Sequence, residues 1–407
     1  MEAAAPVVLV GGGHAAAAFA NSVRRAGYTG RVLLVSDEPV PPYHRPPLSK
    51  KYLADGLPVE QILIRAAAWY EEQKIELRLG RRVEAIDRAT QRVVLDDGEA
   101  LAYSRLVLMT GARPRRLPAA IGGDLQGVLL MRSLADADAL APHLVAGRRM
   151  LVIGGGYIGL EAAAVAVGKG LHVTLLEAAP RILQRVAAPA TSDYFRALHR
   201  ERGVDLREGL SLRRLLADGG RVCGAELDDG SHLDADVVLV GIGVQPNVEL
   251  AEAAGLRLDN GIVVDALCQT SDPAILAAGD CCSFEYRGGR IRLESVQNAN
   301  DQAASAAHTV AGQPKPYAAS PWFWSDQYDC KLQIAGLNTG YDDVVVRPGK
   351  TPRSQSVWYY RGDQLLAVDA MSDPAAYVTA KKLLERGASV PKASAADPAS
   401  EFKTWML

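Results

Sequence analysis

Three glycines and a glutamate near the middle of the chain have types and spacing suited to holding a phosphate and a ribose. Gly154, Gly156 and Gly159 follow a short apolar run, and Glu177 closes a second one. In such a pattern the first glycine makes a tight turn, the second lets the backbone approach a pyrophosphate, and the third packs a helix on a strand. A terminal acid can hold the ribose hydroxyls. The stretch 148–177 therefore predicts a strand–helix–strand dinucleotide site.

The chain opens with a second copy of this pattern. Gly11 and Gly13 follow an apolar run, Ala16 takes the third small position, and Asp37 lies where the ribose acid is expected. Two copies predict two bound dinucleotides, although an ordinary α/β turn is an alternative for the first copy. His14, inside the turn, is interpreted as a capping or solvent-facing residue.

Composition and charge exclude several classes of protein. The 407 residues are 48% hydrophobic and 23% charged, which favours a multidomain enzyme. A net charge of -2 does not indicate binding to nucleic acid or to an anionic membrane. We expect no membrane span and, from residues 1–6, no signal peptide. The cysteines lack redox or zinc spacing and are expected to be reduced thiols in the cytoplasm. No metal site is predicted.

The elements that must position the two glycine turns can be read from apolar runs and turn residues. Strands are expected at 7–10, 31–35, 106–109, 150–153, 173–176 and 237–240, and helices at 15–25 and 189–202. Alternating residues between 73 and 98 and after 202 predict two β-meanders. The proline-rich segment 41–50 predicts a stiff loop that presents Arg45 and Lys50.

Two further features belong to the predicted second dinucleotide site. The strand at 237–240 runs into Gly241-Ile242-Gly243, and ligands bind at strand ends in open α/β sheets. Glu161 lies close to the start of the helix that would cradle a diphosphate, so its carboxylate must point elsewhere to avoid repelling the ligand. Compensation of the helix dipole is the alternative interpretation of this residue.

Several motifs together resemble a known family. Two nucleotide fingerprints, a strand ending in Thr110-Gly111, and Ala278-Gly279-Asp280 resemble the glutathione-reductase-like flavoprotein superfamily. The motifs RPPLSK at 45–50, ESVQNA at 294–299 and PWFWSDQ at 321–327 resemble the ferredoxin reductases of bacterial oxygenase systems. The similarity covers essentially the whole chain. It implies an NADH-dependent enzyme that passes electrons through FAD, one at a time, to a [2Fe-2S] ferredoxin serving a P450 or a dioxygenase.

The resemblance also implies an architecture. It is an α/β fold with two Rossmann-like dinucleotide-binding domains and a C-terminal α/β domain. The FAD domain would cover 1–112 and 244–319, the NAD domain 113–243, and the interface domain 320–407. A rubredoxin reductase and an NADH oxidase are alternatives among enzymes. An NADH-sensing flavoprotein that acts by binding partners is an alternative of another class.

Site residues follow from the same resemblance. The catalytic positions are Lys50, Tyr157, Glu161 and Trp324. FAD positions are Gly11, Gly13, Ala15, Ala16, Asp37, Arg45, Lys50, Val83, Thr110, Gly111, Arg132, Asp280, Val296 and Trp324, and a helix expected from about Asn298 would point at the flavin. NAD positions are Gly154, Gly156, Tyr157, Ile158, Gly159, Glu161, Glu177, Arg185, Gly241, Ile242 and Gly243.

The roles of four of these residues can be stated more closely. In the family, the residue matching Glu161 faces the nicotinamide and pairs with the one matching Lys50 near the flavin. Tyr157 would lie over the flavin and move aside for nicotinamide, and core packing is its alternative role. In a strand, Trp322 and Trp324 share one face. Trp324 is predicted to be the electron exit, with anchoring of an interdomain core as the alternative.

Two further expectations concern the electron acceptor. The paired cysteines of disulfide reductases are absent from the corresponding places, so electrons would leave the flavin directly. The partner would be an acidic ferredoxin that docks on nearby cations. Those cations are Arg290, Arg292, Lys331, Arg347 and Arg361.

Overall fold

The computed structural model describes residues 5–405. The expectation that residues 1–6 contain no signal peptide falls mostly outside these residues. The chain forms two compact units: the first comprises 1–45, 57–113 and 244–319, and the second comprises 46–56, 114–243 and 320–407. The division into three domains stays a prediction. Within residues 5–405, no helix is long and apolar enough to cross a membrane.

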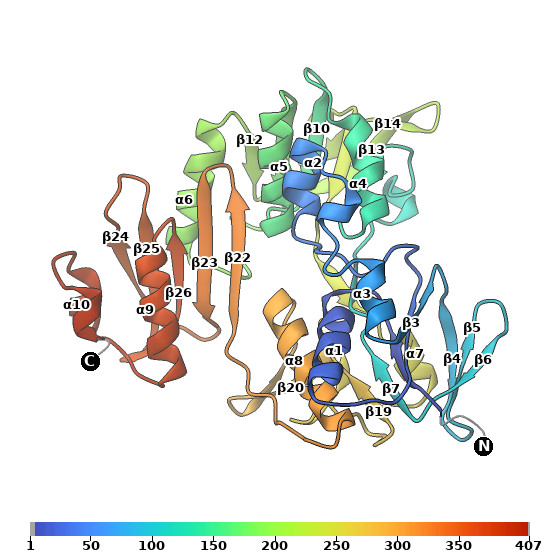
Figure 1. The fold of residues 1–407 in the computed structure, drawn as a ribbon. Helices are drawn as coiled ribbons and strands as arrows, with labels where there is room; N and C mark the ends of the chain where they lie inside the picture. The colour runs from blue at the N-terminus through green and yellow to red at the C-terminus, as the bar shows by residue number, and fades with distance from the viewer. Residues whose placement is uncertain (1–4, 406–407) are drawn as a thin grey trace. The chain divides into compact units, whose positions relative to one another are not determined.

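The first unit is built on a five-stranded parallel sheet of order β19-β7-β1-β2-β3. Its strands are β1 (Val7–Val10), β2 (Val32–Ser36), β3 (Ile75–Leu79), β7 (Arg105–Leu108) and β19 (Ile275–Ala277). Helices α1 (His14–Arg25) and α8 (Val296–Val310) lie side by side (Figure 1). Alanines such as Ala16, Ala20, Ala303 and Ala307 are fully buried there. Their small side chains allow the close approach of the two helices.

Smaller elements complete the first unit. They are α3 (Ala67–Glu72), α7 (Glu249–Ala253), β18 (Ile262–Val263), β20 (Cys282–Tyr286), β21 (Gly289–Ile291), and the antiparallel meander of β4 (Val83–Asp87), β5 (Arg92–Leu95) and β6 (Ala100–Ala102). The prediction of a meander over all of 73–98 was wrong for 75–79. That segment is β3, the parallel edge strand, whose one-sided burial gives the same alternation as a meander strand.

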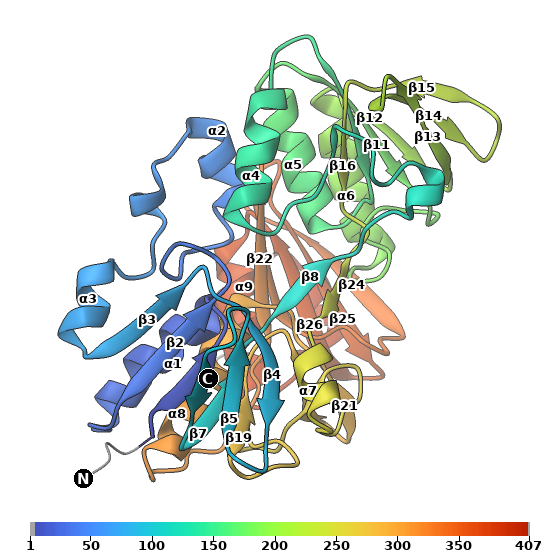
Figure 2. The same ribbon diagram turned by 90° about the vertical axis from the view of Figure 1, so that its right-hand side faces the viewer.

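The second unit contains another five-stranded parallel sheet, of order β12-β11-β10-β16-β9. Its strands are β9 (Val128–Leu129), β10 (Arg149–Ile153), β11 (His172–Glu177), β12 (Asp205–Glu208) and β16 (Val237–Val240), and its helices are α4 (Leu134–Leu140), α5 (Tyr157–Gly168) and α6 (Pro189–Glu201). The predicted second meander is confirmed as β13 (Leu212–Asp218), β14 (Arg221–Leu227) and β15 (His232–Asp234) (Figure 2). Strands β8 (Ala112–Pro114) and β17 (Val244–Pro246), which fall mainly in the segments of the first unit, pair with each other.

The C-terminal part of the second unit is an antiparallel sheet of order β22-β23-β26-β25-β24. Its elements are β22 (Trp322–Gln327), β23 (Cys330–Gly336), β24 (Asp343–Pro348), β25 (Gln355–Arg361), β26 (Gln364–Met371), α9 (Pro374–Glu385) and α10 (Lys392–Ala396). Helix α9 packs on this sheet over a core that includes Trp358 and Tyr360, both fully buried.

The proline-rich segment is a loop only in its first part. From Leu48 to Tyr52 the chain forms a short helical turn, which α2 (Leu53–Asp55) continues. Lys50 departs from helical geometry, with φ -132° and ψ -114°. The prediction of a loop over all of 41–50 was therefore wrong for its last residues, because the prolines end at Pro47 and no longer block helical hydrogen bonds.

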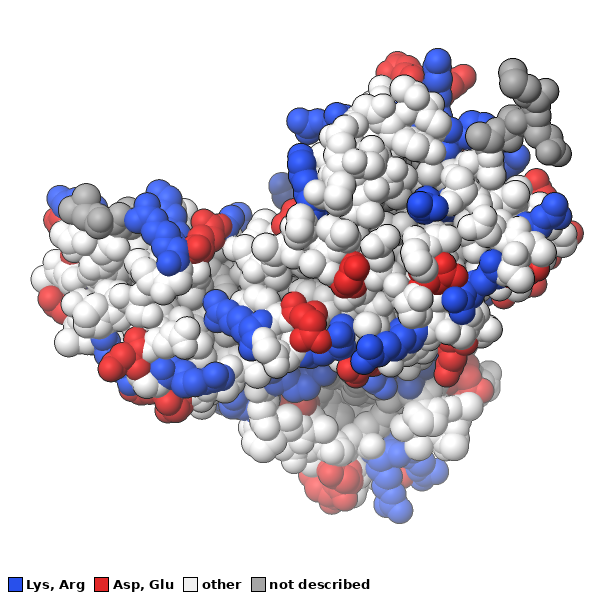
Figure 3. Space-filling view, turned by 90° about the horizontal axis from the view of Figure 1, so that it is seen from below, with Lys and Arg blue, Asp and Glu red and all other residues white. Residues whose placement is uncertain are grey.

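Surface charges of both signs are interspersed on the face that Figure 3 shows, in keeping with the small net charge. Two of the cations predicted for ferredoxin docking have acidic partners, because Arg290 pairs with Glu285 and Arg292 with Glu294. The inclusion of Arg347 was wrong. It is 5% exposed and cannot present its charge to a partner.

Arg347 instead holds the C-terminal tail. Its guanidinium donates hydrogen bonds to backbone carbonyls between 394 and 400, and it lies over the rings of Phe402 and Trp405. A planar fork of several donors suits this arrangement better than the single ammonium of a lysine. One buried side chain thus closes residues 394–405 onto strand β24.

We expect Arg347→Ala to destabilise the protein by about 2 kcal/mol or more, because several buried carbonyls lose a charged donor. The measurement is the urea midpoint, together with limited proteolysis of the tail. Arg361→Ala is the matched control, since Arg361 is exposed and donates to the carbonyls of Thr339 and Gly340. Equal losses in the two variants would contradict the clamp.

Candidate dinucleotide and redox site

The glycine turn of the first unit is shaped by close backbone approach. Gly11 has φ +127°, and a Cβ there would lie 2.2 Å from the Met109 carbonyl oxygen. At Gly13 a Cβ would meet only the Arg45 side chain, at 3.9 Å, so this side of the turn has room for a ligand. Helix α1 begins directly after Gly13 with no side-chain cap, and its first amides can receive a phosphate. The cradle fits a dinucleotide diphosphate.

His14 corrects one interpretation. It is 8% exposed, and its ring lies 5.5 Å from that of His44. It therefore neither faces solvent nor caps the helix, whose N-cap is Gly13. The pattern of the turn could not show this, because the burial of His14 depends on a segment thirty residues away. Its neighbours Ala15 and Ala16 are buried, as small positions of the fingerprint should be.

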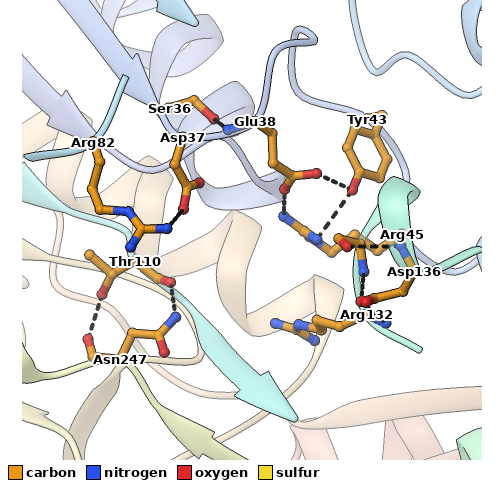
Figure 4. Close-up of polar contacts among 11 residues, drawn as sticks. Ser36, Asp37, Glu38, Tyr43, Arg45, Arg82, Thr110, Arg132, Asp136 and Asn247 are labelled. Atoms are coloured by element: carbon orange, nitrogen blue, oxygen red, sulfur yellow. Dashed lines mark hydrogen bonds and ion pairs between the residues drawn. The ribbon is translucent and has the colours of Figure 1, made fainter. Parts of the chain in front are cut away.

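Two acids follow strand β2, and other side chains hold one of them much more closely than the other. Glu38 accepts hydrogen bonds from Tyr43 and Arg45, and its ion pair with Arg45 measures 2.6 Å (Figure 4). Asp37 is more than half exposed, with Arg82 at 3.4 Å. This supports Asp37 as the ribose acid and explains how Arg45 is fixed. Glu38 was not singled out in the sequence, although it stands next to Asp37.

The other predicted FAD positions of this unit lie at element ends. The Thr110 hydroxyl donates to the Asn247 carbonyl at 2.7 Å, and the Asn247 amide donates back to Thr110 (Figure 4). Gly111 has φ +66°, and Asp280 comes shortly after β19. The Val83 side chain is in the core, so only its backbone can reach a ligand. Val296, not Asn298, is the first residue of α8, because Ser295 caps the helix two residues before the expected start.

In the second unit, each predicted glycine role has a visible cause. A Cβ at Gly154 would lie 2.4 Å from the Gly241 carbonyl oxygen, and one at Gly159 would lie 2.1 Å from the Gly154 carbonyl oxygen. At Gly156 a Cβ would meet no atom within 4 Å. Gly154 and Gly159 therefore permit packing, whereas Gly156 opens the turn. The strand end at Gly241 lies directly against this turn, which brings two predicted segments together.

Three side chains border this turn and strand end. Ile158 and Ile242 are 43% and 37% exposed, which is unusual for isoleucine in a folded unit. Arg185 lies beside Gly243, where a Cβ would be 3.6 Å from its guanidinium. Two apolar surfaces and a cation beside a phosphate-binding turn fit a dinucleotide.

Glu177 is held rigidly at the end of β11. Its Oε2 accepts from the Gly155 amide and its Oε1 from the Ala179 amide, both at 2.7 Å. Arg181 is directed elsewhere, because it donates to Ser192 Oγ at 2.6 Å. The acid that would receive ribose hydroxyls is therefore fixed, while one of the two arginines that could bind a 2'-phosphate is occupied.

Glu161 points away from the phosphate turn and into a buried pocket of donors. Its carboxylate is 3% exposed and lies 2.8 Å from Lys50 Nζ. Ser49 Oγ donates to Oε2 at 2.7 Å, and Ser325 Oγ donates to Oε1 at 2.6 Å. The implied pairing with Lys50 is present, so helix-dipole compensation does not explain this residue. The two serines were missed by spacing, although both lie inside the motifs RPPLSK and PWFWSDQ.

The aromatic residues of β22 divide between its two faces as predicted. Trp322 and Trp324 stack with ring centroids 5.5 Å apart, whereas Phe323 lies 4.9 Å from the ring of Tyr157. Trp322 packs against the C-terminal core, so anchoring is its role. Trp324 is partly exposed beside it.

Arg132, a predicted FAD position, lies on the segment before α4. Its backbone N–H donates a hydrogen bond to the Asp136 carboxylate (Figure 4).

A second buried acid lies on β26. Asp369 is 1% exposed and accepts from Thr191 Oγ1 at 2.7 Å and from the hydroxyl of Tyr359, which in turn accepts from the Ala188 amide. Burial raises the pKa of Asp369 to about 6. This cluster fastens the C-terminal sheet to the start of α6. No sequence pattern indicated it.

Comparison with known proteins agrees with this geometry. Residues 5–303 match the family described as "Pyridine nucleotide-disulphide oxidoreductase", and residues 322–406 match the family described as "Reductase C-terminal". Putidaredoxin reductase of Pseudomonas putida is 45% identical over 94% of this chain and 92% of its own. A ferredoxin–NAD(P)(+) reductase of Sphingomonas sp is 44% identical over 98% and 97%. A crystal structure of a covalent putidaredoxin reductase–putidaredoxin complex superposes with a TM-score of 0.96, at 43% identity over 100% and 99% of the chains.

The chain therefore belongs to the pyridine nucleotide-disulphide oxidoreductase family, and it is an oxidoreductase with FAD and NAD(H) as cofactors. The predicted fold class is confirmed. The contacts of individual residues with the cofactors stay predictions.

We expect Asp369→Asn to change how stability depends on pH. Between pH 3.8 and 6 the folded protein keeps a proton on Asp369 that the unfolded chain loses, so the wild type loses stability as pH rises through this window. The variant has no such loss. The free energy of unfolding of the variant, relative to that of the wild type, should therefore rise by up to about 3 kcal/mol from pH 4 to pH 7.

Urea unfolding at the two pH values measures this difference. Asp363→Asn is the control, since Asp363 is exposed in the turn between β25 and β26. A gap between Asp369→Asn and wild type that stays constant with pH would contradict the assignment of a protonated buried carboxyl.

Proposed function

We propose that the protein carries electrons from NADH, through FAD, to a [2Fe-2S] ferredoxin that supplies an oxygenase. The observation that carries this proposal is the combination of two nucleotide-binding turns, a buried Lys50–Glu161 pair and a C-terminal sheet with Trp324 partly exposed. The relatives at 44–45% identity are named as reductases of putidaredoxin and ferredoxin.

Each unit would bind one cofactor. In the first, Gly11, Gly13 and the start of α1 would hold the FAD diphosphate, and Asp37 the ribose. In the second, Gly154, Gly156 and Glu177 would hold NADH in the same way. FAD held there would supply the chemistry that links a two-electron hydride donor to a one-electron acceptor.

The residues of the second unit would prepare the hydride donor. Lys50 and Glu161 form an ion pair whose charges are mutually neutralised and largely shielded from water. Such a pair can orient the nicotinamide carboxamide, because it offers both a donor and an acceptor. Tyr157, held by Phe323, would move aside when nicotinamide binds.

The thiols support a direct exit of electrons from the flavin. In the described part of the chain all five cysteines are free, and Cys281 and Cys282, with sulfurs 3.7 Å apart, are fully buried. A dithiol without access to solvent cannot exchange with a disulfide substrate. Free thiols also support the cytoplasm as the compartment.

Glu177 should set the choice of coenzyme. Its fixed carboxylate accepts ribose hydroxyls and repels a 2'-phosphate, so we expect NADH to be preferred. Glu177→Ala should weaken the preference by about 1–3 kcal/mol, measured as the ratio of kcat/KM for NADH and NADPH. Glu177→Gln, which removes the charge but keeps an acceptor, should fall between. A wild-type kcat/KM that is higher with NADPH would overturn the assignment.

The function itself is tested by separating the two half-reactions in stopped flow. NADH should bleach the flavin, and the reduced enzyme should then reduce a [2Fe-2S] ferredoxin, more slowly at high salt. Faster reduction of rubredoxin, or of oxygen alone, would favour the alternatives named above. A long-lived reduced flavin with every carrier would favour a sensing role.

Trp324→Ala should slow the ferredoxin step more than the hydride step. Trp322→Phe is the matched control, because Trp322 packs in the C-terminal core. Equal ferredoxin rates in wild type and Trp324→Ala, with FAD fully bound in both, would remove Trp324 from the exit path.

A further inference from the structure

A chain of buried polar side chains runs through the second unit from α6 to Glu161. Ser325, Gln327 and His199 are polar, yet they have no exposed surface. Ser325 and Gln327 share one face of β22 with Phe323, which contacts Tyr157. This face of the strand therefore carries contacts to both predicted catalytic residues of α5.

The direction of the chain is fixed by Gln327. Its amide oxygen can only accept, so His199 Nε2, at 2.9 Å, must carry the hydrogen. Its amide nitrogen can only donate, and it donates to Ser325 Oγ at 3.2 Å. The single hydrogen of Ser325 is then left to point at Glu161 Oε1, at 2.6 Å.

The same reasoning about donors and acceptors applies at the other end of this series of hydrogen bonds, at His199 and Tyr328. Burial lowers the pKa of His199 to about 4, so the ring is neutral near pH 7. With its hydrogen on Nε2, Nδ1 must accept, and the Tyr328 hydroxyl lies 3.1 Å away as the donor. Tyr328 is partly exposed in the turn after β22, beneath the guanidinium of Arg202. All donors along the chain thus point toward Glu161.

We propose that Ser325, Gln327 and His199 are positioning residues, whose one-directional hydrogen bonds hold the Glu161 carboxylate aimed at Lys50. Buried polar groups are costly unless every one is satisfied, so a complete chain of this length specifies one arrangement. The Glu161 carboxylate accepts from Ser49 and Ser325 and pairs with Lys50, so the hydrogen of Ser325 completes its set of donors. The effect on the hydride step rests on the proposed function, whereas the direction of the chain does not.

The activity test compares two buried serines of the C-terminal sheet in the holoenzyme. Ser325→Ala should slow bleaching of the flavin by saturating NADH about tenfold, since a charged acceptor loses a donor. Ser325→Thr restores the hydroxyl and should recover most of the rate. Ser356→Ala is the matched control, because Ser356 is also fully buried but bonds to Trp358 Nε1. Similar bleaching rates for Ser325→Ala and Ser356→Ala would overturn the positioning role.

A second measurement is independent of activity. In ¹⁵N-histidine spectra of the holoenzyme at pH 7, His199 should be the neutral tautomer with hydrogen on Nε2. Tyr328→Phe should shift its Nδ1 signal, and Gln327→Glu, whose carboxylate only accepts, should draw the Ser325 hydrogen away from Glu161 and slow bleaching as Ser325→Ala does. A hydrogen on Nδ1 of the wild-type ring would overturn the stated direction.

The two proposals can fail separately. Flavin bleaching is measured without any ferredoxin, so a protein that bleaches normally but reduces no ferredoxin would contradict the proposed function alone. A wild type that NADH does not bleach would also contradict the proposed function, while the tautomer of His199 would still decide the direction of the chain.

Discussion

A buried carboxylate constrains much of the second unit. The Glu161 side chain is almost fully buried, and an unpaired charge in such a place would strongly destabilise the fold. The charge is balanced by Lys50 from the turn at 48–52. Hydroxyls from that turn and from β22 donate hydrogen bonds to the carboxylate. Two segments far apart in the sequence must therefore meet at one helix, α5.

The same constraint explains why the C-terminal sheet is joined so firmly to the parallel sheet of the second unit. One connection passes through Ser325 and Gln327 to His199, and another through Asp369 and Tyr359 to Thr191. Both connections are polar and buried, so they fix geometry where an apolar contact would allow sliding. Rigid support of this kind suits a site whose side chains must keep a fixed geometry, as the proposed function requires of Glu161.

The phosphate turns rest on a different constraint, the approach of one backbone to another. Position 154 requires glycine because the Gly241 carbonyl lies where a side chain would be. Position 11 requires glycine because the Met109 carbonyl lies in the corresponding place. In each case the partner is the end of a neighbouring parallel strand. The requirement for glycine thus reports tertiary packing as well as the turn itself.

The amino-acid sequence by itself determined the strands, helices and glycine turns of both nucleotide sites, because local periodicity and the absence of a Cβ act over a few residues. Motif resemblance added the Lys50–Glu161 pair. Only the tertiary structure decided the burial of His14, the parallel edge strand at 75–79, the use of Arg347 as a clamp, and the partners Ser49, Ser325 and His199. Each of these depends on contacts between distant segments, and burial or the direction of a hydrogen bond has no local signature in the chain.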